Sequence, residues 1–303
     1  MPRRAFPLSL LALALAAMPS ICQTAARPAP LGRLVDVGGY RVHLYCTGRG
    51  GPSVLIAGAG FSFDWSLVQP EVARLTTVCT YDASGTAWSD PGPVLTCRGR
   101  VNEIHKLVAA AHLETPLVLV GLSIGACVAR LYAAEYPQEV SGMVLVDHAF
   151  SPDPDRDAGK SDPGLHANYD TPPVLIYQAP IVLSTEDISD FNRLPENIRQ
   201  LHRWAESLHP QPATWETAED CLAQLKTAAP GPFALGDVPL VVVSTDNQAR
   251  GYARLQKELM ALSRHSTQML AEHSFHAVEI DQPELVIAAV RKVVETARGP
   301  AGR

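Results

Sequence analysis

The chain has 303 residues, 47% of them hydrophobic and 18% charged, and its formal net charge is -6. This composition lets the chain bury a sizeable core, and it suits one large α/β domain with an insertion better than two unrelated domains. The sequence has no basic run and no basic patch interleaved with aromatic residues. It therefore argues against a nucleic-acid partner and favours a small-molecule substrate.

The first 26 residues have the order of a secretory signal peptide. Arg3 and Arg4 precede an apolar run from Phe6 to Met18, and small and polar residues follow. We expect cleavage between Cys22 and Ala26, which would leave an exported protein, periplasmic or extracellular, with no membrane span. A retained anchor is the alternative, although the apolar run is shorter than the roughly 20 residues that a spanning helix needs.

From residue 33 onward, short apolar runs alternate with segments of helical periodicity. The first two runs flank Gly38-Gly39, which predicts a hairpin. The later alternation predicts βαβ units, and hence a mostly parallel, doubly wound sheet of the eight-stranded type with helices on both faces. The predicted strands are a hairpin at 33–46, then 53–58, 76–82, 116–121, 142–147, 239–245 and 267–272; the predicted helices are 101–113, 124–135, 252–263 and 283–297.

Between residues 148 and 238 the alternation stops. Residues 151–173 are rich in Asp, Pro and Gly and predict an exposed loop. Two predicted helices follow at 194–208 and 214–228, the first with an apolar face formed by Ile198, Leu201, Ala205 and Leu208. We interpret 148–238 as a helical cap inserted into a core made of 27–147 and 239–303. A peripheral helical pair with no role at the site is the alternative.

The segment Gly121-Leu122-Ser123-Ile124-Gly125 fits the pattern G-x-S-x-G, with a predicted strand before it and a predicted helix after it. This context is typical of a nucleophile elbow. Both ends of the G-x-S-x-G pattern need glycine, because the backbone at the serine is strained and larger side chains at these two positions would collide with the neighbouring strand and helix. We predict Ser123 as a nucleophile, and a structural serine at a strand end is the alternative.

A nucleophilic serine needs a base, because a hydroxyl is almost never ionised near neutral pH. His273 and His276 both lie just beyond the last predicted strand. We select His276, which falls in the loop before the final helix, whereas His273 is nearer the strand end and suits a structural histidine. The sequence has no H-E-x-x-H and no C-x-x-C pattern, so we expect no metal and no cofactor.

An acyl-transfer site also needs donors for the developing oxyanion. The backbone N–H of Ile124 would be one, since it begins a helix whose dipole favours negative charge. The second donor is expected from the glycine-rich turn after the strand at 53–58, at Ala59 or Gly60. A glycine turn without chemistry is the alternative.

From about Leu34 to Ala297, the chain resembles the α/β-hydrolase superfamily, and within it a bacterial group of exported, esterase-like proteins. The matching segments are "LYCTG", "AGAGFSFDWSLVQPEVA", "VCTYDASGTAWSDPGP", "VGLSIGACVARLYAAEYP", "GMVLVDHAF" and "SFHAVEIDQPELVIAAVRKVV". The resemblance implies Ser123 as nucleophile, His276 as general base and an oxyanion hole at Ile124 and Ala59. The departures are Ala57-Gly58 in place of a frequent His-Gly pair, Leu122 in place of a frequent histidine, and "DASGTAW" in place of an Arg-containing turn.

Two aspartates qualify as the acid that orients the base. Most of the superfamily carries the acid after the strand that corresponds to 239–245, which selects Asp246. A minority, including haloalkane dehalogenases, carries it at the end of the preceding strand, which selects Asp147. Asp246 comes directly off its strand, earlier than the acid usually falls. We therefore prefer Asp147 and keep Asp246 as the alternative.

These residues predict serine acyl transfer, with a small or medium carboxylic ester as the expected substrate. Lactone, amide and peracid chemistry remain open. Serine at the elbow argues against dehalogenase or epoxide hydrolase activity, which use aspartate there in this superfamily. The alternative from another class is a noncatalytic ligand-binding protein that keeps the fold. The oligomeric state is left open.

Export would allow the cysteines that follow the signal peptide to form disulfide bonds. Cys46 and Cys79 end two strands that should lie next to each other, so we expect a disulfide bond between them. Cys127 lies in the predicted helix that follows the nucleophile and is expected to be a buried free thiol. Cys97 and Cys221 can pair only if the cap folds over the loop that carries Cys97.

Overall fold

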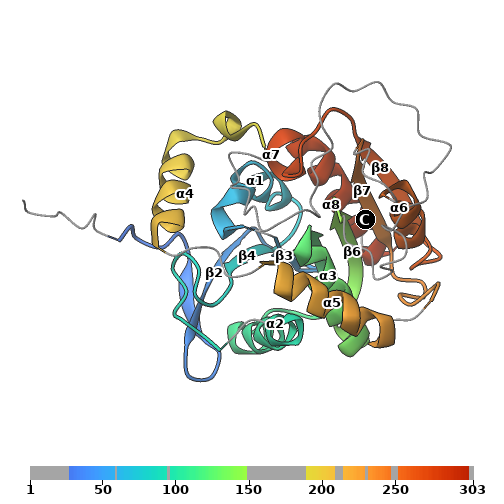
Figure 1. The fold of residues 1–303 in the computed structure, drawn as a ribbon, viewed down its shortest axis with the longest axis horizontal. Coiled ribbons are helices and arrows are strands. Elements are labelled where there is room, and N and C mark those ends of the chain that lie inside the picture. Colours follow the sequence, from blue (N-terminus) through green and yellow to red (C-terminus); the bar gives the residue numbers. More distant parts are fainter. Residues whose placement is uncertain are drawn as a thin grey trace, which may run out of the picture.

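The structure is a computed structural model, and it describes residues 27–58, 60–93, 96–148, 189–208, 214–228, 231–246 and 252–299. The predicted signal peptide, its cleavage point and the predicted exposed loop at 151–173 lie outside these residues. Figure 1 shows a central sheet with helices on both of its faces. In the described part of the chain, no helix combines the length and the apolar character needed to cross a bilayer.

Eight strands form one sheet in the order β1-β2-β4-β3-β5-β6-β7-β8. β2 pairs antiparallel with both β1 and β4, and every other neighbouring pair is parallel. The strands are β1 (Arg33–Asp36), β2 (Arg41–Thr47), β3 (Val54–Ala57), β4 (Val78–Asp82), β5 (Leu117–Leu122), β6 (Val140–Val146), β7 (Leu240–Thr245) and β8 (Ser266–Ala271). The predicted doubly wound α/β sheet with an antiparallel start is confirmed.

The central strands are apolar along their length because both faces of the sheet are covered. Every residue of β3, β5 and β7 is buried, as parallel strands packed between two layers of helices require. One hydrophobic cluster joins the sheet to α2, α3 and α6, and a second joins it to α1 and α8. The helices are α1 (Gln69–Val72), α2 (Cys97–Ala111), α3 (Ile124–Glu135), α4 (Glu196–Leu208), α5 (Thr214–Ala228), α6 (Tyr252–Met260), α7 (Val278–Asp281) and α8 (Pro283–Arg298), with 3-10 turns η1 (Ser62–Leu67), η2 (Pro137–Glu139) and η4 (Phe191–Arg193).

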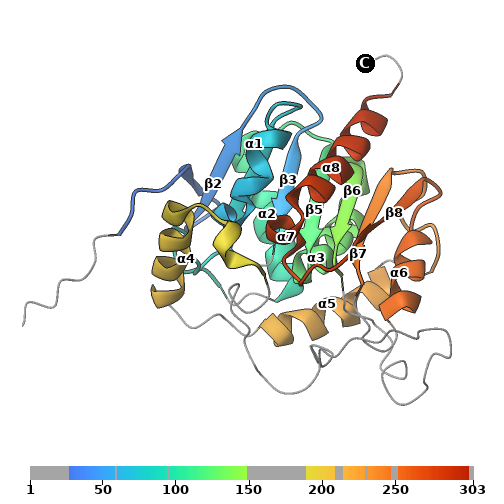
Figure 2. The ribbon, with the colours of Figure 1, turned by 90° about the horizontal axis from the view of Figure 1, so that it is seen from above.

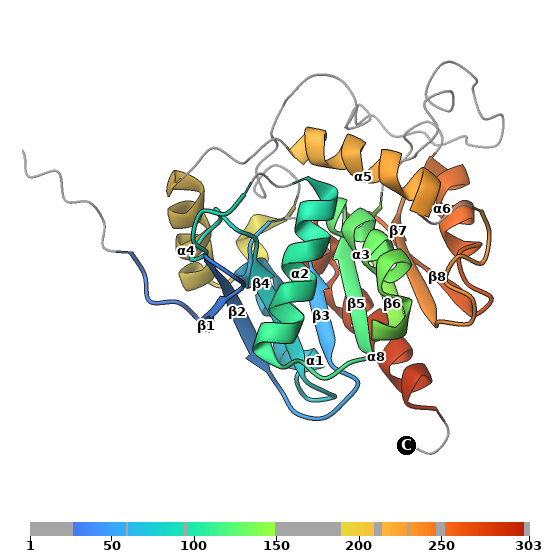
Figure 3. The same cartoon turned by 90° about the horizontal axis from the view of Figure 1, so that it is seen from below.

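Both helices predicted for the cap are present, but they lie apart. α4 packs against η1, whereas α5 packs against α3 and α2. Figure 2 and Figure 3 show the two helices at separate places, with α5 running across one end of α3. Ile198 and Ala205 of the predicted apolar face of α4 are buried, while Leu208 is 40% exposed because the helix ends there.

The described cysteines form two disulfide bonds. Cys46 and Cys79 are direct partners in the register of β2 and β4 and are bridged, which confirms the predicted pair. Cys97 at the start of α2 is bridged to Cys221 of α5. The backbone N–H of Cys97 also donates to the Asp220 carboxylate at 2.7 Å. α5 is therefore fixed to the start of α2, beyond the carboxyl end of β4.

Candidate active site

Ser123 occupies a strained corner between β5 and α3. Its backbone angles are φ 55° and ψ -121°, a conformation that a non-glycine residue keeps only where the surrounding structure imposes it. A Cβ at Gly121 would lie 2.5 Å from the Gly125 carbonyl oxygen, and one at Gly125 would lie 1.7 Å from that of Ala57. Both glycines of the predicted elbow are therefore required by close backbone packing.

His276 and Asp147 form a hydrogen-bonded pair at the same edge of the sheet. His276 Nδ1 lies 2.5 Å from Asp147 Oδ2. The Asp147 side chain is 2% exposed and that of His276 is 18% exposed. Asp147 follows β6, and the Ser123 N–H donates to the carbonyl of Val146, the preceding residue, at 3.0 Å. The elbow and the aspartate are thus held together through the backbone of β6.

The second oxygen of Asp147 has partners of its own. The Tyr252 hydroxyl donates to Oδ1 at 2.5 Å, and the Thr245 hydroxyl lies 3.1 Å from the same atom. Asp147 has φ 37°, and its N–H donates to the Val243 carbonyl at 2.8 Å. One carboxylate oxygen therefore faces β7 and α6 while the other faces His276.

Asp246 has a different partner. Its Oδ2 accepts the backbone N–H of His273 at 3.1 Å and lies 3.5 Å from His273 Nδ1. The structure thus separates the two aspartates and the two histidines considered from sequence into the pairs Asp147–His276 and Asp246–His273. The second pair joins the end of β7 to the loop after β8.

The turn after β3, predicted to supply an oxyanion donor, is held by two carboxylates. Ala59 itself lies outside the described residues, and Gly60 has φ 98°. The N–H of Phe61 donates to Asp64 Oδ2 at 2.9 Å, and the N–H of Ser62 donates to Asp82 Oδ1 at 2.7 Å. These bonds fix the chain directly after Gly60.

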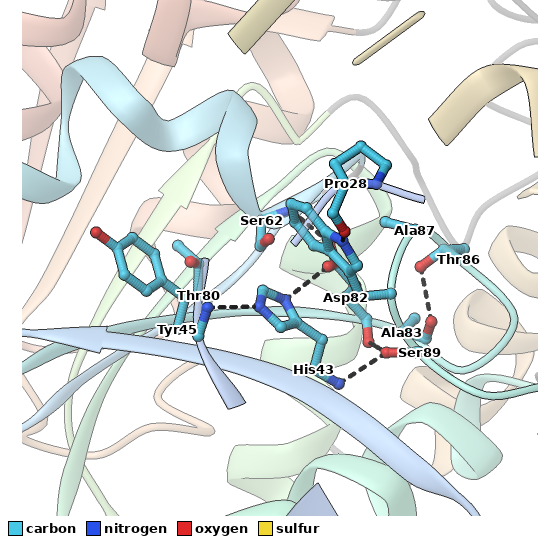
Figure 4. A network of polar contacts seen from close by, with 12 residues as sticks. Pro28, His43, Tyr45, Ser62, Thr80, Asp82, Ala83, Thr86, Ala87 and Ser89 are labelled. Carbon is cyan, nitrogen blue, oxygen red and sulfur yellow. Dashed lines mark hydrogen bonds and ion pairs between the residues drawn. The ribbon is translucent and has the colours of Figure 1, made fainter. Parts of the chain in front are cut away.

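Asp82 belongs to a second buried histidine–aspartate pair, drawn in Figure 4. His43 Nδ1 lies 2.8 Å from Asp82 Oδ2, and both side chains are fully buried. His43 Nε2 accepts the N–H of Gly32 at 2.9 Å, so the ring proton is on Nδ1 and is donated to Asp82. Both ring nitrogens are occupied, which makes this pair a structural support for Ser62 and its turn.

Asp64 is paired with His202 of α4. His202 Nδ1 lies 2.9 Å from Asp64 Oδ1, and Nε2 lies 3.1 Å from Glu206 Oε1. Burial lowers the pKa of His202, but the carboxylates of Asp64 and Glu206 outweigh it, so the net shift is upward. The rings of Phe61, Phe63 and Phe191 surround the imidazole. α4 is therefore attached to the turn through a buried histidine–aspartate hydrogen bond.

His148 is hydrogen-bonded to the elbow at Ser123 and to Arg130. Its Nε2 lies 2.9 Å from Arg130 Nη1, and its ring also hydrogen-bonds the backbone of Ser123. A guanidinium can only donate, so Nε2 accepts and the Nδ1 proton is left for the Ser123 carbonyl. Burial and Arg130 lower the pKa of His148 well below 6.5. The ring is therefore neutral and able to fill both roles.

A buried carboxyl group lies beside these residues. Glu279 of α7 is 1% exposed, and its Oε2 has no hydrogen-bond partner. Burial raises the pKa of Glu279 well above 4.5, and the nearby charges of Asp64, Asp281 and Asp147 raise it further. The Glu279 carboxyl group therefore keeps its proton to a higher pH than an exposed glutamate does. In the described part of the chain, no three His, Cys, Asp or Glu side chains are grouped to hold a metal ion.

Sequence reasoning missed the residues that support these pairs. His148 follows Asp147 directly, so its position at the same strand end was a usable signal. Tyr252 and His202 had none, because each reaches its partner only through the tertiary fold.

Comparison with known proteins identifies the family of the chain. The alpha/beta hydrolase fold family matches residues 44–278, and the chain belongs to this family. It is 24% identical over 248 residues to the uncharacterized protein YqjL of Bacillus subtilis, covering 79% of this chain and 82% of that protein. Membership of the family supports a hydrolase.

Solved structures share the fold at lower identity. An esterase from Thermogutta terrifontis has a TM-score of 0.59 and 20% identity over 85% of this chain and 94% of its own. A loop variant of a haloalkane dehalogenase from Bradyrhizobium elkanii has a TM-score of 0.65 and 15% identity over 89% of this chain and 97% of its own. Proteins of different chemistry match equally well, so the reaction must be argued from the site.

Proposed function

We propose that the protein is a serine hydrolase that cleaves a small or medium carboxylic ester through an acyl-enzyme intermediate. The observation that carries this proposal is the hydrogen-bonded His276–Asp147 pair, which lies at the same edge of the sheet as the strained Ser123. In this proposal Ser123 is the nucleophile, His276 the general base and Asp147 the acid that orients it. Asp246 is given a structural role because it contacts His273.

The reaction would proceed in two halves. His276 takes the Ser123 hydroxyl proton as the oxygen attacks the ester carbonyl, and it then gives that proton to the leaving alcohol. In the second half His276 takes a proton from water, which attacks the acyl-enzyme, and returns it to Ser123. Asp147 stabilises the imidazolium in both halves. The oxyanion would be bound by the N–H of Ile124 and by Ala59 or Gly60.

Serine at the elbow also limits the chemistry. Opening an alkyl halide or an epoxide through a covalent intermediate requires a carboxylate nucleophile, and the elbow carries a hydroxyl. An acyl group fits a serine–histidine–aspartate arrangement. Ester, lactone, amide and peracid substrates all contain such a group, and the ester is our choice.

A fluorophosphonate probe tests the proposal, because only an activated serine reacts with it. We expect the mature protein to be labelled at Ser123 and to hydrolyse short acyl esters, and Ser123→Ala to remove labelling and lower kcat by about 10⁴-fold or more. Ser141→Ala is the matched control, since the Ser141 hydroxyl bonds to the Pro116 and Leu117 carbonyls at the far end of the sheet. A folded wild-type protein that is neither labelled nor active would favour the noncatalytic binding protein.

We also propose that the protein is exported. The signal-like segment at 1–26 suggests it, and the bonds Cys46–Cys79 and Cys97–Cys221 support it, because disulfides persist mainly in oxidising compartments. Cell fractionation and N-terminal sequencing of the mature chain test this. Retention in the reducing cytoplasm with an uncleaved N-terminus would contradict it.

A further inference from the structure

We propose that Tyr252 is a positioning residue for the His276–Asp147 pair: its hydroxyl, aimed at Asp147 Oδ1, keeps Oδ2 directed at the imidazole. The contact between the Tyr252 hydroxyl and Oδ1 is 2.5 Å, and that between Oδ2 and His276 Nδ1 is also 2.5 Å. The inference deepens the proposed function, on which its catalytic consequence rests. The effect on the imidazole follows from the contacts alone.

The direction of the tyrosine hydrogen bond is fixed by its surroundings. The backbone N–H of Thr245 donates to the Tyr252 oxygen at 2.9 Å, so that oxygen already accepts one bond and its own proton is free to point at Asp147. Burial, together with the Asp147 charge, raises the pKa of Tyr252 well above 10. The hydroxyl therefore remains protonated and acts as a donor over the whole range in which a histidine titrates.

The tyrosine is itself anchored by regular structure. Tyr252 is 5% exposed and is the first residue of α6, which packs on β7. Thr245 is the last residue of β7 and places a second hydroxyl 3.1 Å from Asp147 Oδ1. The acid is consequently oriented at Oδ1 by the end of a strand and the start of a helix, while Oδ2 contacts His276.

Removing the tyrosine hydroxyl weakens the hold on the carboxylate. Oδ1 loses a strong donor, so the carboxylate becomes freer to rotate and Oδ2 is no longer kept directed at the imidazole. The other groups that face the carboxylate are His276, the Thr245 hydroxyl and Glu279 of α7, and none of them changes in Tyr252→Phe.

The experiment compares Tyr252→Phe with a matched control. Tyr132→Phe also removes a buried tyrosine hydroxyl from a carboxylate, but that carboxylate is Glu139 in η2, away from the site. The proton between His276 and Asp147 is followed by NMR as the downfield Nδ1–H signal that is lost in His276→Asn. In Tyr252→Phe we expect this signal to broaden through faster exchange with water, because the carboxylate is freer to rotate, and the plateau kcat/KM for an ester to fall about tenfold. Tyr132→Phe should change neither quantity.

The outcomes separate the inference from the proposed function. If wild type lacks hydrolysis and probe labelling but the Nδ1–H signal broadens in Tyr252→Phe, the positioning role stands and the esterase proposal fails. If wild type is an active esterase and Tyr252→Phe matches Tyr132→Phe in this signal and in rate, the inference is wrong. Should Tyr252→Phe fail to fold, Thr245→Val removes the other hydroxyl from Asp147 Oδ1 and must broaden the same signal.

Discussion

Replacing Asp147 by Asn tests the assignment of the acid. The asparagine side chain has one carbonyl oxygen and one amide nitrogen. The Tyr252 and Thr245 hydroxyls lie 2.5 and 3.1 Å from the present Oδ1, and both require an acceptor, so the carbonyl should take that position. The amide NH₂ then replaces Oδ2, which lies 2.5 Å from His276 Nδ1. That group can only donate, so Nδ1 must accept and the ring proton moves to Nε2.

A ring protonated at Nε2 cannot take the serine proton. The wrong tautomer costs about 10⁴-fold in kcat in such triads, which is about 5.5 kcal/mol of transition-state stabilisation. Asp246→Asn is the matched control, because its amide oxygen can still accept the His273 N–H, and its kcat should stay within about twofold of wild type. The assay is ester hydrolysis by both single variants and the double, alongside thermal melts. If Asp246→Asn alone abolishes turnover in a folded protein, Asp246 is the acid and this reasoning is refuted.

Three further predictions concern stability. Glu279 has a raised pKa, so it keeps a proton at pH values where the unfolded chain has lost it. As pH rises above 4.5, the free energy of unfolding of wild type should therefore fall by up to about 1.4 kcal/mol per pH unit. Urea titrations of Glu279→Gln should lack this slope, and parallel profiles would contradict the prediction. His202 also has a raised pKa, so its pair with Asp64 contributes fully to the free energy of unfolding below pH 6.5, and this contribution is lost at higher pH. His202→Gln should remove that part of the pH dependence of stability, and an unchanged stability profile would count against the prediction. Replacing Cys97 and Cys221 by Ser opens a loop with a sequence separation of 124, which by the chain-entropy relation costs about 4.9 kcal/mol; an unchanged melting temperature without reductant would exclude the bridge as a stabilising element.

Local sequence pattern was sufficient for most of the fold. Continuous apolar runs marked the buried strands, and their alternation with helical segments indicated the parallel sheet, because both signals arise from neighbours along the chain. The predicted segment 101–113 began four residues late, since α2 starts at Cys97 behind the Thr96 cap. Helices as short as α1 and α7 were missed because four residues are too few to show a period.

The sequence alone determined the elbow at Ser123, the candidate base His276 and the bridge Cys46–Cys79, because strand ends and adjacent strands follow from the predicted topology. Only the tertiary structure paired Asp147 with His276 and Asp246 with His273. The partner of an aspartate depends on loop paths and on a positive φ, and neither leaves a mark in hydrophobic periodicity.

The supporting contacts were also decided by the tertiary structure. Tyr252 meets Asp147 across 105 residues, and His202 meets Asp64 across 138. The first contact joins the residue after β6 to α6, and the second joins the turn η1 to α4. The docking of both helices depends on the whole core. A single polar side chain on such a helix carries no local signal of its partner, so its place at the site follows from packing.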